Sequence, residues 1–401
     1  MSKWLSVVGI GEDGIEALPP ASRSLIEAAD ILVGGKRHLA MAGVDARPRI
    51  TWATPLSLTL DEIVSHKNKR VCVLATGDPL WFGIANSLVK RVPVDEITLV
   101  PSPSAFSLAC ARLGWALHEV DCLTLHGRPL DLLHAALAPK ARILILSHDG
   151  TTPEAVADML CDRGFGTSKM TVFEHMGGNH ERRVEASAEK WDAPDIADFN
   201  TIAVECIAGA NASIRPKIPG LPDDAFIHDG QLTKREVRAI TLAKLAPFPG
   251  ALLWDVGAGC GSVAIEWMRA AKNTRAIAFE RNQLRLQMIA DNANGLGTPF
   301  LEIVSGTAPE CLENASTPDA IFIGGGITTP GLFEHCWQAL SGQGRLVANA
   351  VTLEGEAQLN ELFCDHGGEL TRISISRAQS IGQYRSWQPF RPVAQWSIVK
   401  P

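Results

Sequence analysis

The chain has 401 residues, of which 46% are hydrophobic and 20% charged, a composition typical of globular proteins with two or three domains. Its formal net charge of −7 argues against nucleic-acid binding as the main task, because such binding usually needs a basic face. The sequence contains no apolar run long enough to span a membrane, no signal-peptide pattern at its start and no CxxC pair among its nine cysteines. We therefore expect a cytoplasmic protein with no membrane partner and no metal site.

The first half of the chain alternates short apolar runs with helix-like stretches up to about residue 207, which predicts an α/β architecture. The predicted strands are Leu5–Ile10, Ile31–Val33, Val71–Ala75, Ile97–Val100, Ile143–Ser147, Met170–Glu174 and Thr201–Cys206. The predicted helices are Pro20–Ala29, Trp81–Val89, Ser104–Leu113 and Pro153–Asp162.

Glycines and polar residues gather just after these strands. The stretch VVGIGEDG carries glycines such as Gly9, and VLATGDPLWFG carries Gly77 and Asp78, although a GDP sequence is as often only a turn. In VPSPSAFS, Ser102 and Ser104 precede a helix, where hydroxyls can cap free N–H groups or contact a ligand. Two further groups are candidate substrate contacts, although the second is expected to be solvated surface charge: His126 with Arg128 in LTLHGRP, and the cluster Lys36, Arg37 and His38.

Residues 208–230 are rich in Gly, Pro and Asp and lack a sustained period, which predicts a linker between domains 1–207 and 231–401. The second domain opens with LTKREVRAITLAKLA, a helical pattern in which Thr233 and Glu236 fit a capping box. Strands are predicted at Ala251–Val256, Arg275–Glu280, Leu301–Ser305, Ala320–Ile323 and Gly344–Ala350, followed by two β-like runs, LTRISIS and AQWSIVK.

A glycine-rich turn, WDVGAGCGS, follows the first of those strands. Its glycines Gly257, Gly259 and Gly261 are spaced GxGxG, whereas a dinucleotide fingerprint would have its third glycine at Ser262. Glu280 lies 19 residues past Gly261, where an acid suits the ribose of either NAD or S-adenosylmethionine. The glycine spacing and the later VSGTAPE segment favour S-adenosylmethionine, and a turn kept only for packing is the minor alternative.

The second half then resembles a specific family. Residues 226–308, together with PDAIFIGGG and SRAQSIG, are similar to the C15-methyltransferase/decarboxylases of cobalamin biosynthesis. The resemblance implies a class I methyltransferase with a mostly parallel seven-stranded sheet whose last strand runs antiparallel. It also implies that the donor is held by Thr233, the loop Gly257, Gly259 and Gly261, Glu280 at the ribose and Ala308 beside the adenine. For Thr233, a simple N-cap is the alternative role.

The first half resembles the tetrapyrrole methylase family, in its precorrin C5-methylating branch, through the four motifs above and through ADILVGGKRHL and VFEHMGGNHERRVEAS. The resemblance covers roughly residues 3–206 and implies a class III methyltransferase made of two α/β subdomains. Gly9, Gly77, Asp78, Ser102 and Ser104 would line the donor site. The usual GxGPGD loop is only partly kept, since Glu12 and Asp13 follow Gly11, and the role of this loop therefore stays open.

This domain order resembles the fused precorrin methyltransferases that methylate C5 and C15 and decarboxylate an acetate arm in aerobic cobalamin biosynthesis. The resemblance implies two S-adenosylmethionine sites per chain, a polycarboxylate tetrapyrrole substrate and a homo-oligomer. Candidate cations for the substrate carboxylates are Arg377, Lys234 and Arg238, although an exposed helix face explains the last two equally well. The sequence identifies no proton donor.

Three alternative functions remain. A dinucleotide-dependent reductase is disfavoured by Ser262, and a regulatory donor sensor by the intact glycine loop. An RNA or protein methyltransferase with an N-terminal recognition domain is disfavoured by GDPLWFG and PSPSAF, which make the first half look like a second donor site.

Overall fold

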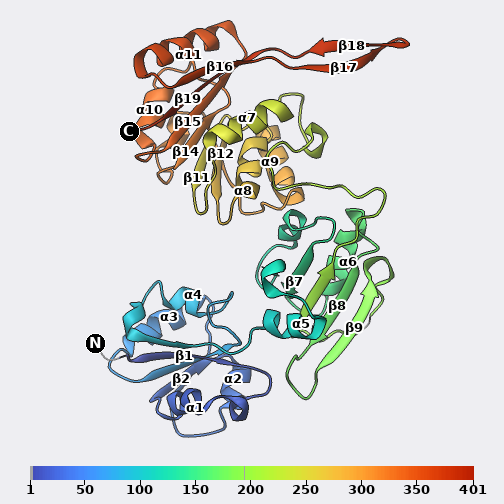
Figure 1. Ribbon diagram of the computed structural model, residues 1–401. Coiled ribbons are helices and arrows are strands. Elements are labelled where there is room, and N and C mark those ends of the chain that lie inside the picture. Colours follow the sequence, from blue (N-terminus) through green and yellow to red (C-terminus); the bar gives the residue numbers. More distant parts are fainter. Residues whose placement is uncertain (1–2, 194) are drawn as a thin grey trace. The chain divides into compact units, whose positions relative to one another are not determined.

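The computed structural model describes residues 3–193 and 195–401. Its contacts divide the chain into two compact units: residues 1–130 with 138–213, and residues 131–137 with 214–401. Figure 1 shows sheets flanked by helices in each of the two units, which we describe separately.

The strands of the first unit are β1 Leu5–Ile10, β2 Ile31–Gly34, β3 Arg49–Ile50, β4 Val71–Thr76, β5 Ile97–Val100, β6 Asp121–Thr124, β7 Arg142–Leu146, β8 Lys169–Glu174, β9 Arg182–Ser187 and β10 Asn200–Glu205. Its α-helices are α1 Pro20–Glu27, α2 Lys36–Met41, α3 Leu56–Ser65, α4 Ala85–Leu88, α5 Ala105–Leu113 and α6 Thr152–Asp162. The strands form two five-stranded sheets, ordered β3-β2-β4-β1-β5 and β6-β7-β10-β8-β9.

The first of these sheets is wholly parallel and is covered by helices on both faces. Alternate residues of β1 point to opposite faces, as the period of a strand requires. Val7 packs in one core with Leu60 of α3 and Leu88 of α4, while Val8 packs in another with Ile26 of α1. In a parallel sheet all carboxyl ends lie at one edge, so the loops after β1, β4 and β5 are brought together there.

The strands of the second unit are β11 Leu252–Val256, β12 Arg275–Glu280, β13 Glu302–Ser305, β14 Ala320–Ile323, β15 Arg345–Ala350, β16 Glu369–Ile373, β17 Ser376–Ile381, β18 Tyr384–Pro389 and β19 Val393–Val399. Its α-helices are α7 Arg235–Leu245, α8 Ser262–Ala270, α9 Gln283–Gly295, α10 Leu332–Ala339 and α11 Leu353–His366.

Seven of these strands form one sheet, ordered β13-β12-β11-β14-β15-β19-β16. Only the last strand of the chain, β19, runs against its neighbours, which confirms the predicted class I topology. Leu253 faces a core shared with α7, α8 and α9, whereas Leu252 and Trp254 face a core shared with α10 and α11. The sheet is therefore the middle of three layers, and its β11 carboxyl edge carries the glycine turn.

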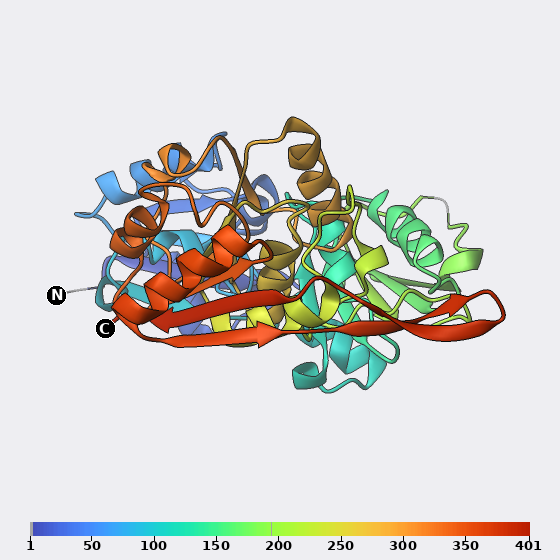
Figure 2. The same ribbon diagram turned by 90° about the horizontal axis from the view of Figure 1, so that it is seen from above.

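A two-stranded hairpin of β17 and β18 extends beyond the seven-stranded sheet of the same unit (Figures 1 and 2). It was not predicted as a separate element, since the β-like tail was expected to complete the sheet. Three large side chains on it are mostly exposed: Ile381 at 63%, Tyr384 at 70% and Trp387 at 71%. A lone two-stranded hairpin is only marginally stable in water. Exposed apolar side chains on such a hairpin are typical of an interaction surface.

Most predicted elements are present within one or two residues of their expected ends, but two helix predictions are wrong in detail. The helix expected at Trp81–Val89 is reduced to Ala85–Leu88, because Phe82 has a left-handed φ of 57° and a Cβ on Gly83 would lie 2.4 Å from the Pro79 carbonyl oxygen. In addition, β3, β6 and β9 were not predicted.

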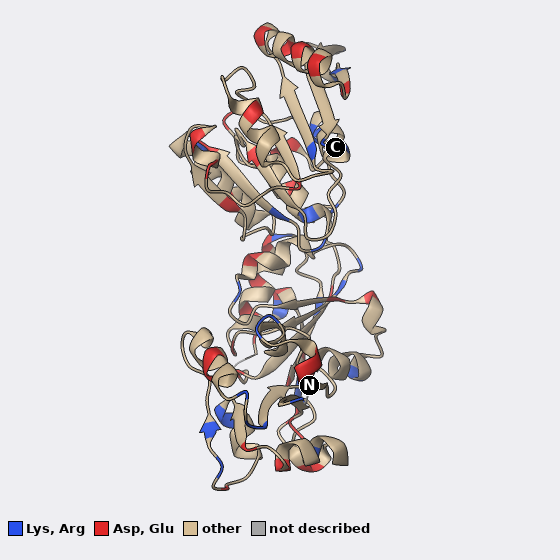
Figure 3. Ribbon diagram, turned by 90° about the vertical axis from the view of Figure 1, so that its left-hand side faces the viewer, with Lys and Arg blue, Asp and Glu red and all other residues tan. Residues whose placement is uncertain are grey.

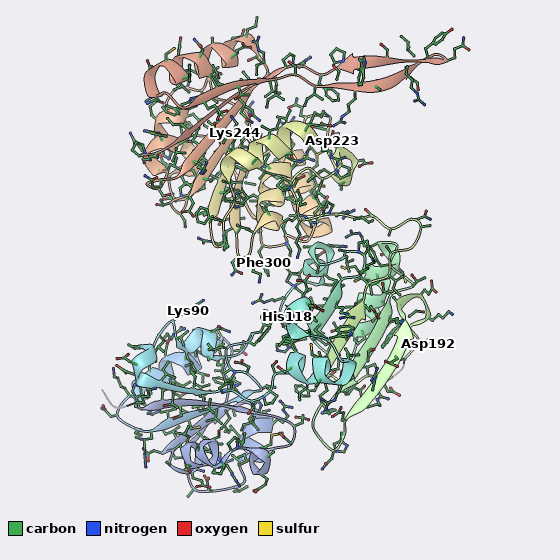
Figure 4. All side chains as sticks on the ribbon, viewed as in Figure 1. Lys90, His118, Asp192, Asp223, Lys244 and Phe300 are labelled. Atoms are coloured by element: carbon green, nitrogen blue, oxygen red, sulfur yellow. The ribbon has the colours of Figure 1, made fainter. Side chains whose placement is uncertain are left out.

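The capping box predicted at the start of α7 is the second error. Lys234 rather than Thr233 is the N-cap residue, and it makes no side-chain capping bond. Instead, Asp223 Oδ1 accepts the backbone N–H of Arg235 at 2.9 Å, so a residue twelve positions upstream satisfies the first turn. Asp223 is labelled beside α7 in Figure 4, with Lys244 near the other end of the helix.

No helix among the described residues is long and apolar enough to cross a membrane. Acidic and basic residues are interspersed on both units (Figure 3).

Candidate active sites

The predicted donor residues of the first unit meet at the carboxyl edge of its parallel sheet. Ser102 Oγ donates to the carbonyl oxygen of Gly9 at 2.7 Å, and Ser102 N–H donates to the carbonyl oxygen of Gly77 at 3.1 Å. A Cβ on Gly9 would lie 1.8 Å from that same Gly77 oxygen, so only glycine fits there. Ser104 caps α5 by accepting the Ser107 N–H at 3.1 Å. Residues up to 95 positions apart in sequence therefore form one compact edge.

Asp78 forms a tight turn at this edge. Its Oδ1 accepts the N–H of Leu80 at 2.9 Å, and the residues that follow, Trp81 and Phe82, expose about two-fifths of their surface. Both rings pack on Phe106 of α5, with centroids 5.8 and 6.0 Å away. The turn thus presents an aromatic surface next to the glycines, which suits contact with a flat conjugated ligand.

His126 and Arg128 lie after β6 in the same unit and are exposed. The guanidinium of Arg128 lies 5.6 Å from the ring centroid of Phe82. Arg128, which follows a strand of the second sheet, thus contacts the aromatic turn that follows a strand of the first sheet. The rings of His126 and His148 are 5.6 Å apart. Arg128 and His148 also line a surface hollow at the start of α6. Arg128 therefore lies near the turn that begins at Asp78. Among the described residues, no acid pairs with Arg128.

The Lys36, Arg37 and His38 cluster differs from the expectation of solvated charge. Lys36 is exposed, but His38 is buried and its pKa is lowered to about 4, first by burial and then by Arg37. Arg37 is half-buried and forms an ion pair with Glu12. The expectation was wrong for His38 because α2 turns that side chain under the sheet edge, 3.1 Å from Thr76 Oγ1.

The glycine turn of the second unit has the geometry that its spacing predicts. Gly257, Gly259 and Gly261 have φ values of 72°, 62° and 80°, a region that side chains disfavour. A Cβ on Gly261 would also lie 3.0 Å from Ile289 Cγ2. The turn leads into α8, and its backbone is held from both sides, since Gly257 and Ala258 N–H donate to the Phe279 carbonyl oxygen and Ala264 N–H donates to Asp255 Oδ2.

Glu280 holds this turn in place. The side chain is buried, its Oε2 accepts the Gly259 N–H at 2.9 Å, and its Oε1 accepts the N–H groups of Arg281 and Asn282 at 3.0 Å each. Two carboxylate oxygens can accept about four hydrogen bonds, so one further position remains for a ribose hydroxyl. The structure places Glu280 beside the loop, as a ribose-binding acid requires.

Asp255 is a buried acid at the same edge that is not among the predicted site residues, although it lies within the WDVG motif of the glycine-rich turn. Its Oδ2 accepts the Ala264 N–H at 3.0 Å, while its Oδ1 has no partner among the described residues. Burial, opposed only in part by that hydrogen bond, raises the pKa of this carboxyl to about 7. Asp255 therefore gains or loses a proton near neutrality within hydrogen-bonding distance of the α8 start.

The three candidate substrate-binding cations of the second unit differ in burial and in ion pairing. Arg238 is completely buried, with its Nε 2.7 Å from Glu266 Oε1, and presents no surface to a substrate. Arg377 is one-third exposed and donates to Glu236 Oε2 at 2.6 Å and to Asp223 Oδ2 at 3.1 Å. Lys234 is half-buried and has no ion-pair partner within the described part of the chain. Of the three, Lys234 is partly exposed without an acidic partner among the described residues, Arg377 is partly exposed but paired, and Arg238 is buried.

The two remaining predicted donor contacts lie at the edges of this region. Thr233 is half-buried directly before α7, and its carbonyl oxygen accepts a bond from the Arg238 guanidinium. Ala308 follows β13 and packs against the core on the α10 side of the sheet. Their contact with a donor stays a prediction.

Each half of the chain matches a family model. Residues 5–192 match the tetrapyrrole (corrin/porphyrin) methylases, and residues 224–400 match the precorrin methyltransferase domain. A precorrin-6Y C(5,15)-methyltransferase (decarboxylating) from Sinorhizobium sp is 45% identical over all of this chain and 97% of its own length. A protein of the same name from Mycobacterium tuberculosis is 41% identical over 98% of this chain and 99% of its own length.

A solved structure, the C-terminal domain of a precorrin-6Y C5,15-methyltransferase from Rhodobacter capsulatus, is 45% identical over 46% of this chain and all of its own, with a TM-score of 0.44. The fold and the two glycine-lined edges, with the two family models and the full-length relatives, define a two-domain S-adenosylmethionine-dependent methyltransferase. More particularly, the chain belongs to the precorrin-6Y C(5,15)-methyltransferase (decarboxylating) family.

Proposed function

We propose that this chain transfers two methyl groups from S-adenosylmethionine to a precorrin-6Y-type tetrapyrrole, at C5 and at C15, and removes one acetate carboxyl group as carbon dioxide. One observation carries the proposal: each of two units with different folds has a glycine-lined edge of the kind that holds a nucleotide-like donor, at Gly9 with Gly77 and at Gly257 to Gly261. An enzyme with one donor site and a separate recognition domain would need only one of these two glycine-lined edges.

Two donor molecules per chain are part of this proposal. In the first unit, the donor would lie against Gly77, Asp78 and Ser102. The backbone segments beside it are packed too closely to leave room for a side chain at the glycines. In the second unit it would lie against Gly259 with its ribose at Glu280. Because the sulfonium is already activated, the protein mainly has to align the methyl group with the nucleophilic carbon.

We assign C5 methylation to the first unit and C15 methylation with decarboxylation to the second. Decarboxylation leaves an electron pair that the protonated pyrrolic system can accept, so the protein needs chiefly to hold and orient the remaining carboxylates. Arg128 beside the Phe82 ring serves that purpose in the first unit, and Lys234 with Arg377 in the second. The substrate is a small molecule of the cytoplasm rather than a nucleic acid, in keeping with the net charge of −7.

The test uses the full chain with precorrin-6Y and S-adenosylmethionine, followed by mass spectrometry of the product and trapping of carbon dioxide. Two methyl additions and one decarboxylation per tetrapyrrole are expected. Asp78→Ala should remove the C5 methyl, and Glu280→Ala should remove the C15 methyl. Methyl transfer to RNA or protein but not to the tetrapyrrole would support the alternative function and contradict the proposal.

Self-association is the last part of the proposal. The exposed surface of Ile381, Tyr384 and Trp387 on an isolated hairpin supports it, because another copy of the chain would cover these side chains. Sedimentation of the full chain should show an oligomer that Trp387→Ser with Tyr384→Ser weakens. The substitution Phe300→Ser, at an exposed aromatic residue elsewhere in the unit, is the matched control. A monomer at micromolar concentration would contradict this part.

A further inference from the structure

An ion-paired cluster joins the two sheets of the first unit beside the donor edge. Glu12 comes two residues after β1, and its carboxylate lies between Arg37 of α2 and His175, which directly follows β8 of the second sheet. Glu12 Oε2 is 2.9 Å from His175 Nδ1, while Oε1 accepts from Arg37 Nη1. A Cβ on Gly178 would lie 2.9 Å from Glu12 Cβ, so the two loops are in close contact.

The cluster is held rigidly and touches the donor edge. The Glu12 side chain is only 12% exposed. The Arg37 guanidinium lies 4.0 Å above the ring of Phe199 and donates to Thr76 Oγ1 at 3.2 Å. Thr76 is the residue before Gly77, at which the proposed donor site begins. Glu12 thus replaces the usual proline of the first loop with a carboxylate whose orientation is fixed from both sides.

His175 has two further features. Its backbone has a φ of +46°, a left-handed conformation that is uncommon for non-glycine residues and that six other described non-glycine residues share. Its side chain remains 31% exposed, and its Nε2 has no partner among the residues that the structure describes. A carboxylate that accepts a bond from Nδ1–H holds the imidazole in the tautomer whose Nε2 can accept a proton.

The proposed C5 methylation has to dispose of one proton. The new carbon–carbon bond forms as the carbon–sulfur bond breaks, the sulfonium leaves as a neutral thioether, and a hydrogen of the tetrapyrrole is released as a proton. A base of moderate strength near the reacting carbon accelerates such a step, and histidine suits it near neutral pH.

We propose that His175 accepts the proton released in methyl transfer in the first unit, and that Glu12 is the positioning residue that fixes its tautomer. The inference rests on the proposed C5-methylation function of this unit. The charged and titratable groups that face His175 are Glu12, His180 at a ring distance of 6.3 Å and the adjoining Glu174, which is paired with Arg182; Arg37 faces it through Glu12.

The positive φ of His175 permits a clean experiment, because glycine and asparagine tolerate that conformation. His175→Gly and His175→Asn are made in the full chain, and the C5 methyl transfer is followed in single turnovers with saturating donor. We expect the rate to fall about 10²–10³-fold in both. Glu12→Gln should lower it about 10-fold, since the carboxylate acts only through the histidine. Added imidazole should restore part of the rate in His175→Gly.

Three readouts separate this role from a structural one. Binding of S-adenosylhomocysteine to the first unit and the thermal unfolding temperature should stay at the wild-type values. The wild-type rate should fall at low pH, because a base must be unprotonated to accept a proton, and His175→Asn should lose that acid limb of the pH profile. His180→Asn, the matched control, should keep both the rate and the limb.

An unchanged C5 rate and pH profile in His175→Asn, with an active wild type in the same assay, would overturn the inference and leave the proposed function intact. A wild type that adds no C5 methyl would instead overturn the proposed function. Loss of rate in His175→Gly without any rescue by imidazole, combined with weakened donor binding, would identify the cluster as a structural contact between the sheets and would also overturn the inference.

Discussion

Arg377 Nη1 donates to Asp223 Oδ2 at 3.1 Å, across 154 residues of sequence. The same aspartate accepts the first amide of α7 through its other oxygen, and Arg377 also binds Glu236 of that helix. Arg377 therefore ties the base of the β17–β18 hairpin to the start of α7, the helix before which the donor-contact candidate Thr233 lies. It also holds the pKa of the Glu236 carboxyl below its ordinary value.

Replacement of Arg377 by Ala is expected to slow decarboxylation and weaken tetrapyrrole binding, because a cation suited to a substrate carboxylate is lost. Stability should change little, by about 1 kcal/mol or less, since the ion pair is partly exposed. Steady-state carbon dioxide release and urea unfolding measure the two effects. Arg372→Ala, which breaks an exposed pair with Glu356 in the same unit, is the control. Unchanged turnover and unchanged affinity in Arg377→Ala would rule out the role.

Glu280→Gln should weaken donor binding in the second unit by about 10–100-fold, because the carboxylate organises Gly259 and, in the proposed site, would bind the ribose more strongly than an amide. Calorimetry with S-adenosylhomocysteine measures the affinity. The control is Glu313→Gln, an exposed acid outside the loop. Equal affinities of wild type and Glu280→Gln would place the donor elsewhere.

Replacing Arg238 by Ala should destabilise the second unit by about 3–5 kcal/mol, because Glu266 would remain buried without its cation. The Glu266 oxygens also accept the N–H groups of Gly220 and Leu221, so the segment before α7 should loosen as well. Urea unfolding followed by tryptophan fluorescence reports the change. A loss below about 1 kcal/mol would show that the pair does not hold this segment.

Asp255 should make the second unit less stable as the pH rises. Its folded pKa of about 7 lies above the ordinary value of 3.8, so the folded state retains a proton that the unfolded state releases. The stability difference between Asp255→Asn and wild type should therefore grow between about pH 4 and pH 7 and level off above. Urea unfolding across this range measures it. Parallel pH profiles of the two proteins would mean that Asp255 is ionised throughout.

The sequence predicted most of the elements because strands such as β14 are short apolar runs followed by glycines, and β11 departs from this pattern only at Asp255; such buried strands are easily recognised. The positive φ values of Gly257, Gly259 and Gly261 follow from their spacing in a strand-turn-helix motif. The roles of Thr233 and Ala308 came only from the family resemblance, and nothing local to these residues implies them.

Contacts between distant residues could not be predicted. Glu12 and His175 are 163 positions apart, and only the packing of one sheet against the other reveals their pairing. Arg238 looks like an exposed helical arginine in the sequence, because the acid that neutralises it, Glu266, belongs to α8. The cap of α7 was misassigned for the same reason, since Asp223 reaches back from an irregular segment that local patterns do not place.

The central claim is that one chain holds two donor sites of unrelated architecture. Isothermal titration of the full chain with S-adenosylhomocysteine tests it most directly, with Glu280→Ala to remove one class of site. We predict two molecules bound per chain in the wild type and one in the variant. One molecule per chain in the wild type, lost entirely in Glu280→Ala, would contradict the claim.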